Sequence, residues 1–303
     1  MTPKQIRVAA VGCADIGRLA AWARLPYVTI SAVCDATGPL AARTAELFTG
    51  SSAFTSVEDL LAVGSYDVID VSLPASQQFE VCVSCLKAGN RVLCTVPFMG
   101  SSELAKLANT AAQHYNGTIV PAFPLRFHPL VQELKQLLVE DDLGTPALVD
   151  VFLSAEKPSQ PPALGASLVT GLQAVDVARY LVGELTLLHA VMKKSDPTWA
   201  VDDIANSVME SQSAVVTVTS RWGRDTCGNR VTVSGSAGTA IVDLDASIMR
   251  YSTAAWPEWR THHTSDARPL FEMTSQLADA ILSEKTLPMT YQDGFEALKL
   301  CSY

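Results

Sequence analysis

The stretch IRVAAVGCADIGRLAAWARL, residues 6–25, decides the fold. It opens with the apolar and β-branched run IRVAAV (6–11), turns at a glycine, and continues in the helical pattern IGRLAAWARL (16–25). A short apolar run predicts a buried strand, and apolar residues spaced along one face predict a helix. The stretch therefore indicates the first strand, tight turn and helix of an α/β domain.

The same alternation continues to about residue 120. Apolar runs predict further strands, and amphipathic stretches between them predict helices. The strands are expected at 30–35, 66–74, 91–97 and 118–123, and the helices at 39–48, 78–89 and 102–117. Strands that alternate with helices over short connections pair in parallel, with helices on both faces of the sheet. We expect residues 1–122 to form a Rossmann-type, doubly wound parallel sheet.

The pattern changes after residue 123. Helices are expected at 128–140, 169–183 and 271–285, but most of the strands here follow one another without a helix between them. Such a run of strands is typical of an α+β domain on an open mixed or antiparallel sheet, which we assign to residues 123–303. An open sheet face needs a cover, so we expect a homodimer or homotetramer formed through this sheet.

Composition excludes several classes of partner. The chain has 303 residues, with 22 Lys and Arg against 31 Asp and Glu, for a net charge of −9. This balance argues against nucleic acid or an anionic membrane as partner. No apolar run reaches the roughly 18 residues of a membrane helix. The N-terminus lacks the pattern of a secretory signal, and the 7 scattered cysteines are expected to be reduced, so we expect a cytoplasmic protein.

The turn after the first strand has the pattern G-x-A-x-x-G. Gly12 would allow the tight turn, and Gly17 would let the helix pack closely on the strand. The free N–H groups at the start of the helix would face a pyrophosphate. The predicted dinucleotide contacts in this loop are Gly12, Ala14, Asp15, Ile16 and Gly17. Ala14 replaces the usual second glycine and adds a methyl group where the backbone would approach phosphate.

Asp35 ends the second predicted strand, in ISAVCDAT. A carboxylate at this position accepts hydrogen bonds from the ribose hydroxyls of NAD and repels a 2′-phosphate. Ala36 and Thr37 follow without an arginine, so NAD is favoured over NADP. The alternative is a tight turn in an α/β domain that binds nothing.

Several segments in this order resemble the glucose–fructose oxidoreductase and inositol dehydrogenase family (Gfo/Idh/MocA). They include the loop at 12–17, CLKAGNRVLCTVP, RFHPLVQELKQLL, DLGTPALVDV and VSGSAGTAIVD. The resemblance extends over nearly the whole chain. It implies an N-terminal Rossmann domain, a C-terminal domain whose sheet often forms the subunit interface, and hydride transfer between nicotinamide and a sugar, polyol or related carbonyl compound.

The resemblance also implies site residues beyond the loop. It places further cofactor contacts at Leu73, Pro74, Gln78 and Pro97, and Gln78 stands where a histidine is common. Where the family usually has Glu-Lys-Pro, whose lysine polarises the substrate oxygen, this chain has Thr95-Val96-Pro97. Val96 therefore occupies the position of the lysine.

A second family motif, Asp-x-Gly-x-His-x-x-Asp, carries the acid/base histidine on a helix. Matching its glycine and last aspartate to Gly171 and Asp176 places Val169 at the first aspartate and Gln173 at the histidine. The chain is identified as a divergent member of the family that lacks the usual catalytic Lys, Asp and His. Its catalytic residues stay unknown at this stage.

Four residues are candidates for a substrate pocket. They are Thr95, Arg126, His128 and Gln173. The segment PLRFHP lies at the expected junction of the two domains, where such residues line a cleft or support it. Alternatively, Arg126 anchors the connection between the domains and His128 caps the helix that follows it.

These observations favour an NAD(P)-binding oxidoreductase that transfers hydride to or from an activated small molecule, such as an imine, an enone or another carbonyl compound. Positioned acid and base groups supply roughly 10²–10⁴-fold in rate, and an activated substrate can react without them. Two alternatives are a catalytically silent nucleotide-binding sensor or regulator, and a non-redox lyase or cyclase. No spacing of histidines, cysteines or carboxylates predicts a metal site.

Overall fold

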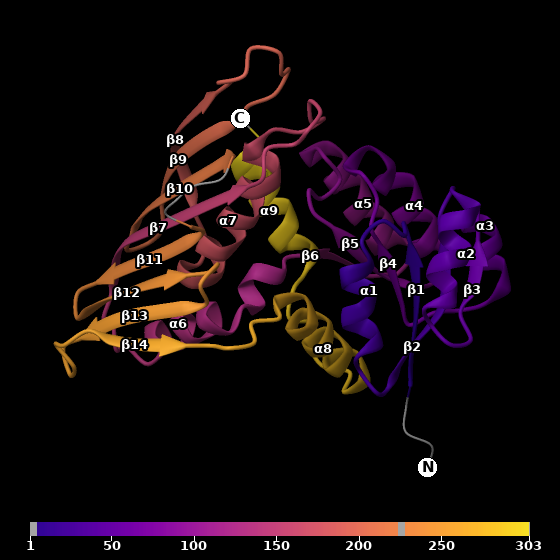
Figure 1. Ribbon diagram of the computed structural model, residues 1–303, viewed down its shortest axis with the longest axis horizontal. Helices are drawn as coiled ribbons and strands as arrows, with labels where there is room; N and C mark the ends of the chain where they lie inside the picture. The colour runs from indigo at the N-terminus through magenta and orange to yellow at the C-terminus, as the bar shows by residue number, and fades with distance from the viewer. Residues whose placement is uncertain (1–4, 224–227, 303) are drawn as a thin grey trace. The chain divides into compact units, whose positions relative to one another are not determined.

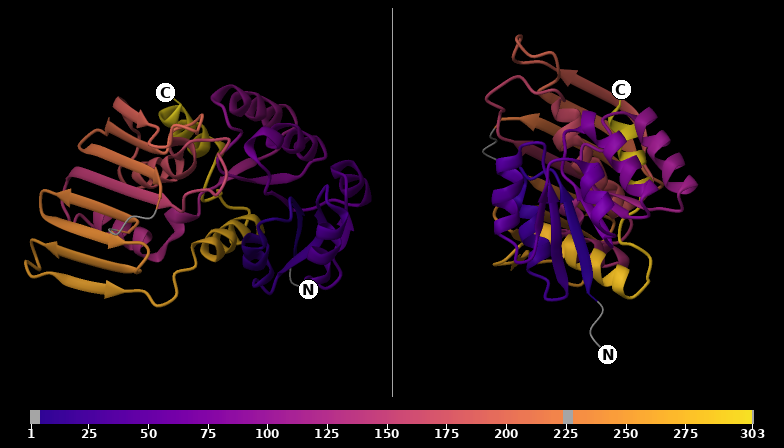
Figure 2. Two further views of the ribbon diagram at one scale, coloured as in Figure 1. Left: turned by 45° about the horizontal axis from the view of Figure 1, so that its top comes forward. Right: turned by 90° about the vertical axis from the view of Figure 1, so that its right-hand side faces the viewer.

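The computed structural model describes residues 5–223 and 228–302. The chain divides into two compact units (Figures 1 and 2). The N-terminal unit comprises the residues up to Pro124 together with Leu270–Glu296. The C-terminal unit comprises Leu125–Pro269 and the residues from Ala297 onwards.

The N-terminal unit is built on a parallel sheet in the order β3-β2-β1-β4-β5-β6. Its strands are β1 (Ile6–Val11), β2 (Val28–Cys34), β3 (Ser52–Phe54), β4 (Val68–Val71), β5 (Arg91–Thr95) and β6 (Ile119–Ala122). Its helices are α1 (Ile16–Ala23), α2 (Gly38–Glu46), α3 (Val57–Val63), α4 (Ala75–Lys87) and α5 (Ser102–His114). The predicted doubly wound sheet is confirmed.

The central strands are mostly apolar because both faces of the sheet are covered, and Asp70 of β4 is a buried exception. Val8, Ile69 and Leu93, from β1, β4 and β5, have no exposed surface. Because all six strands are parallel, their carboxyl ends lie at one edge of the sheet, where the loops that follow them can form a site.

Residues 270–296 depart from the predicted domain division, which assigned everything after residue 122 to the second domain. The segment contains most of α8 (Pro269–Leu282) and the first half of α9 (Tyr291–Cys301). The Tyr27 hydroxyl donates to Asp279 at 2.7 Å, and the rings of Phe98 and Tyr291 lie edge to face with centroids 5.9 Å apart. These contacts join positions far apart in the sequence, which periodicity cannot reveal.

The C-terminal unit is built on a mixed sheet in the order β14-β13-β12-β11-β7-β10-β9-β8. Its strands are β7 (Pro146–Ala155), β8 (Thr186–Lys193), β9 (Ile204–Glu210), β10 (Val215–Trp222), β11 (Arg230–Gly235), β12 (Gly238–Asp243), β13 (Ile248–Thr253) and β14 (Arg260–His263). β7 and β10 are parallel, and the other paired strands are antiparallel. The predicted open mixed sheet is confirmed.

Two helices cover one face of this sheet, α6 (Pro129–Val139) and α7 (Ala166–Val182) (Figure 1). The covered face buries alternate residues of the strands, such as Val149 and Val151 of β7. The intervening positions face the other way, and Leu148 is 58% exposed. Among the described helices, none is long and apolar enough to cross a membrane.

Candidate functional site

A cavity of about 350 Å³ lies at the carboxyl ends of β1, β2 and β4 in the N-terminal unit. We call it the nucleotide cavity. Its lining includes Gly12, Ala14, Asp35, Leu73 and Pro74, which the sequence pattern and the family resemblance had singled out. The structure therefore brings together residues from three separate loops of the parallel sheet. A cavity at this edge is the usual place of ligands in open α/β sheets.

At Gly12 the backbone of the loop passes close to the backbone that follows β4. Its φ angle is +92°, in the left-handed region that favours glycine. A Cβ atom on Gly12 would lie 2.1 Å from the carbonyl oxygen of Ser72. The Gly12 N–H also donates to the Cys34 carbonyl at 2.9 Å. Only glycine fits this turn.

Gly17 does not have the predicted role in packing. The residue is exposed, and a Cβ atom on it would meet no closer atom than Asp15 Oδ1 at 3.4 Å. The expectation that Gly17 is needed for close packing of helix on strand is therefore wrong. Ala14, Asp15 and Ile16 are exposed as well, and of these only Ala14 lines the nucleotide cavity.

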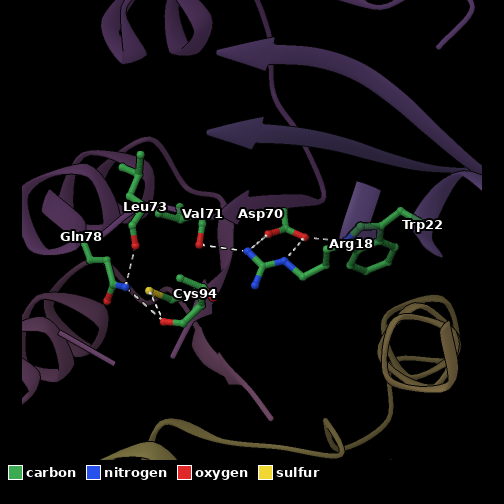
Figure 3. A network of polar contacts seen from close by, with 8 residues as sticks. Arg18, Trp22, Asp70, Val71, Leu73, Gln78 and Cys94 are labelled. Carbon is green, nitrogen blue, oxygen red and sulfur yellow. Dashed lines mark hydrogen bonds and ion pairs between the residues drawn. The ribbon is translucent and has the colours of Figure 1, made fainter. Parts of the chain in front are cut away.

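The helix α1 is anchored by a buried ion pair instead (Figure 3). Arg18 Nε donates to Asp70 Oδ2 at 3.0 Å, and its Nη2 forms an ion pair with Asp70 Oδ1. Trp22 Nε1 donates to the same carboxylate at 2.8 Å. Arg18 Nη2 also donates to the Val71 carbonyl at 3.1 Å. Burial raises the pKa of Asp70, and the Arg18 guanidinium opposes that shift.

The Asp35 carboxylate is held in place by backbone N–H groups. Its Oδ2 accepts from Cys13 N at 3.0 Å, within the glycine-containing loop, and its Oδ1 accepts from Thr37 N at 2.8 Å. Each carboxylate oxygen can accept two hydrogen bonds, so one site on each oxygen is left for a hydroxyl group. Asp35 is half-buried and lines the nucleotide cavity, so a ribose diol fits this carboxylate.

Two of the other predicted cofactor contacts do not line this cavity. Gln78 has no exposed surface, and its carboxamide is used in hydrogen bonds within the protein. Pro97 is half-buried in the segment after β5, together with Thr95 and Val96. The residues that follow β4 therefore line the nucleotide cavity, and those at the end of β5 do not.

Sequence reasoning missed several residues of the cavity wall. They are Thr55, Val57, Ser72, Gln77 and Val81. The position of Ser72 and Gln77, just after β4 and at the start of α4, could have indicated them. Thr55 and Val57 follow β3, whose three residues are too few to give a periodic signal.

In the C-terminal unit, Arg126 and His128 have structural partners. Arg126 Nε donates to Asp176 Oδ2 at 3.0 Å, and its Nη2 pairs with the other carboxylate oxygen. His128 Nδ1 accepts from Leu130 N at 3.2 Å and caps α6, as the structural alternative proposed. Both side chains are buried, and burial lowers the pKa of His128, so the imidazole is neutral.

The helix α7 presents a stripe of half-buried side chains that includes Val169, Gln173 and Tyr180. These positions are four and seven residues apart, so they share one face. Within the described part of the chain, the Gln173 carboxamide has no hydrogen-bond partner. Asp176 lies on the same face and is occupied by Arg126. The stripe therefore offers two neutral polar groups, the Gln173 carboxamide and the Tyr180 hydroxyl.

The cysteines and possible metal ligands add no further site. Cys13, Cys34, Cys82, Cys85, Cys94 and Cys301 are buried free thiols, and Cys227 lies outside the described residues. Burial raises the pKa of Cys34 to about 11 and that of Cys85 to about 12. Over residues 5–223 and 228–302, no group of three His, Cys, Asp or Glu side chains could hold a metal ion.

Comparison with known proteins gives matches for both units. Residues 6–122 match the model of the oxidoreductase family with an NAD-binding Rossmann fold, and residues 131–241 match the GFO/IDH/MocA C-terminal domain. A D-apiose dehydrogenase of Paraburkholderia graminis is 24% identical, over 80% of this chain and 69% of the relative. The uncharacterized oxidoreductase YrbE of Bacillus subtilis is also 24% identical, over 97% of this chain and 92% of the relative.

Solved structures show the same fold. Levoglucosan dehydrogenase, in complex with NADH and levoglucosan, has a TM-score of 0.88 at 18% identity and covers 98% of this chain and 95% of its own. A 3-ketoreductase from Actinomadura kijaniata, in complex with TDP-benzene and NADP, has a TM-score of 0.82 at 21% identity, over 98% and 96% of the two chains. With both of its units matched, the chain belongs to the Gfo/Idh/MocA family of oxidoreductases.

Proposed function

We propose that the chain is an NAD-dependent oxidoreductase that acts on an activated small molecule, such as an imine, an enone or another carbonyl compound. The observation that carries this proposal is the nucleotide cavity with Gly12 at its turn and Asp35 on its wall. A bound nicotinamide dinucleotide would accept or donate the hydride. Gly12 keeps the loop close to Ser72, and Asp35 offers two acceptor sites to a ribose diol.

The choice of an activated substrate follows from the missing titratable groups. Val96, Val169 and Gln173, at the positions where the family resemblance expects Lys, Asp and His, cannot exchange a proton near neutral pH. Arg126 is engaged by Asp176, and His128 is a neutral helix cap. A substrate that takes its proton from solvent or from its own neighbouring group requires none of these residues.

The relatives support redox chemistry over a lyase or cyclase. One is named D-apiose dehydrogenase, and another is an inositol 2-dehydrogenase of Corynebacterium glutamicum, 29% identical over 38% of this chain and 34% of the relative. A sensor without turnover would bind the nucleotide equally well. A panel of carbonyl, imine and conjugated compounds, followed by nicotinamide absorbance, separates the two. No change with any compound, while the cofactor is bound, would favour the sensor.

The variant Asp35→Asn tests the nucleotide site directly. We expect NADH to bind about 10- to 100-fold more weakly, because charge-assisted hydrogen bonds contribute roughly 1.5–3 kcal/mol. NADPH should bind at least as well as before, since the repulsion of its 2′-phosphate is removed. Titration of both cofactors by nicotinamide fluorescence measures the change in preference. The control is Asp142→Asn, which removes one negative charge in the same way at an exposed position of the C-terminal unit. An unchanged preference would contradict the role of Asp35.

We also propose a homodimer that covers the open face of the C-terminal sheet. Leu148 and Val215 are cross-strand neighbours on that face, 58% and 45% exposed. The variant Leu148→Lys would bury an unpaired ammonium group in such an interface, and we expect the dimer to dissociate about 100-fold more readily. Light scattering after size exclusion measures the mass. Val139→Lys, at the 66% exposed end of α6, is the control. A monomeric wild-type protein would refute this assembly.

A further inference from the structure

Gln78 connects three separate segments of the N-terminal unit. It lies on α4 and has no exposed surface. Its Nε2 donates to the Leu73 carbonyl at 3.0 Å and to the Thr95 carbonyl at 3.2 Å, while its Oε1 accepts from Met99 N at 2.7 Å. Figure 3 shows Gln78 beside Leu73 and Cys94, with the carboxamide nitrogen aimed between the two strand ends. One side chain thus joins the ends of β4 and β5 and the turn after β5.

The carboxamide is the chemical group that these three partners require. Two carbonyl oxygens need two donors, and one N–H needs an acceptor, which a glutamine supplies in a single planar group. Met99 has a φ of +58° and Gly100 a φ of +68°, so the turn leaves the regular path of a strand here. The Met99 side chain is fully buried, and leaving its N–H without a partner would destabilise this turn.

Leu73 relates this connection to the nucleotide cavity, because it is part of the cavity wall. Three consecutive carbonyl groups at the end of β4 are fixed from different sides. Arg18 binds the Val71 carbonyl, Gly12 lies against the Ser72 carbonyl, and Gln78 binds the Leu73 carbonyl. The same Gln78 nitrogen then holds Thr95, so the cavity wall and the segment at 95–99 have a shared support.

We propose that Gln78 is a positioning residue of the nucleotide site, which joins the cavity wall at Leu73 to the segment at 95–99 through its carboxamide. It acts through the backbone and contacts no ligand in the nucleotide cavity. The identity of the ligand rests on the proposed function. The hydrogen bonds that Gln78 makes with Leu73, Thr95 and Met99 do not depend on it.

Two substitutions separate the donors of Gln78 from its acceptor. Gln78→Met removes both and keeps a side chain of similar length. Gln78→Glu keeps the acceptor for Met99 but sets a carboxylate against two carbonyl oxygens at pH 8. Burial and the facing carbonyls raise the pKa of the introduced carboxyl, so acid would protonate it and restore one donor. Gln113→Glu, the same change at an exposed site on α5, is the matched control.

The pH comparison requires that neighbouring groups keep their charge. The titratable side chains next to Gln78 are the thiols of Cys82, one helical turn along α4, and Cys94 on β5. The Cys82 thiol donates a hydrogen bond to Cys94, and together with burial this raises the pKa of Cys82 well above the usual value, so that thiol stays neutral from pH 5.5 to 8. The turn at 98–100 carries no titratable side chain, and α5 packs beside α4 through alanines such as Ala105 and Ala108.

Calorimetric titration with NAD+ at pH 5.5 and pH 8 is the first readout. At pH 8 we expect both variants to bind about tenfold more weakly than the wild type, as the loss of buried hydrogen bonds predicts. At pH 5.5 the Gln78→Glu variant should recover most of this loss relative to the wild type at the same pH. The Gln78→Met variant should not recover. Equal losses in both variants at both pH values would assign Gln78 to packing alone and overturn the proposal.

Hydrogen exchange of the Met99 amide is the second readout and needs no ligand. Exchange should become at least about tenfold faster in Gln78→Met, where the acceptor is lost, and stay slow in Gln78→Glu, where it remains. If the wild type binds no NAD+, the proposed function fails, while this exchange pattern still supports the connection. An unchanged Met99 exchange rate in Gln78→Met would overturn it, whether or not the nucleotide binds.

Discussion

Replacing Gly12 with alanine should abolish nucleotide binding and destabilise the N-terminal unit. The new Cβ atom would lie 2.1 Å from the Ser72 carbonyl oxygen, far inside van der Waals contact. The φ of +92° adds backbone strain that an L side chain rarely tolerates. Together we expect a loss of about 3 kcal/mol or more, because the clash is with backbone directly after the central strand β4, which is held on both sides and cannot easily move away.

Urea unfolding and titration with NADH measure the two effects of Gly12→Ala. Gly17→Ala is the matched stability control in the same loop, since a Cβ there would meet no closer atom than a side-chain oxygen at 3.4 Å. An alanine in the first turn of α1 should leave the unfolding free energy unchanged or slightly higher. A Gly12→Ala protein as stable as the wild type would mean that the loop adopts another path.

The second large effect is expected for Arg18→Leu. This change leaves Asp70 buried with Trp22 as its remaining side-chain donor. Removing one partner of a buried ion pair typically costs 3–5 kcal/mol, and we expect about that loss at pH 7. The double variant Arg18→Leu/Asp70→Leu should recover most of it, since no charge is then left in the core. Urea unfolding of the two variants gives the comparison.

The loss in Arg18→Leu should depend on pH in a definite direction. Without the guanidinium, burial is opposed mainly by the hydrogen bond from Trp22, so the folded-state pKa of Asp70 rises further above the unfolded value. The folded variant then binds a proton that the unfolded chain releases, so its stability falls as pH rises from about 4 toward neutrality. The deficit relative to the wild type should therefore shrink near pH 4. A deficit that is constant between pH 4 and pH 7 would contradict the buried charge as its cause.

The sequence predicted the parallel sheet because buried parallel strands are continuous apolar runs separated by amphipathic helices. It also predicted the loop at Gly12 and the carboxylate at Asp35, because both depend on local backbone order after a strand. β3 and α3 were not predicted: the strand has three residues, two of them exposed, and no periodicity develops in so short an element.

Partners distant in the sequence were beyond the reach of pattern reasoning. The sequence analysis did not single out Arg18, whose buried partner Asp70 lies 52 residues away inside a mostly apolar strand and makes Arg18 a core residue. Gln78 was predicted to contact the cofactor. Its three backbone partners lie in segments that meet only in the folded sheet, so its structural role could not be recognised from the sequence. His128 illustrates the opposite case, because the proline that follows it marks a helix start and made the capping alternative visible.

The return of residues 270–296 to the N-terminal unit has a consequence for biosynthesis. Gly294 packs against Pro121 and Phe98, with its ideal Cβ position 3.0 Å from the proline ring. A ribosome makes the chain from its N-terminus, and domains contiguous in sequence can fold as they emerge. Here the surface around Pro121 and Phe98 would stay exposed to solvent after the six strands of the first sheet are made. It would be covered only after more than 140 intervening residues, 125–269, had been synthesised. Completion of the nucleotide-binding unit therefore depends on residues 270–296, which are synthesised well after all six strands of its sheet.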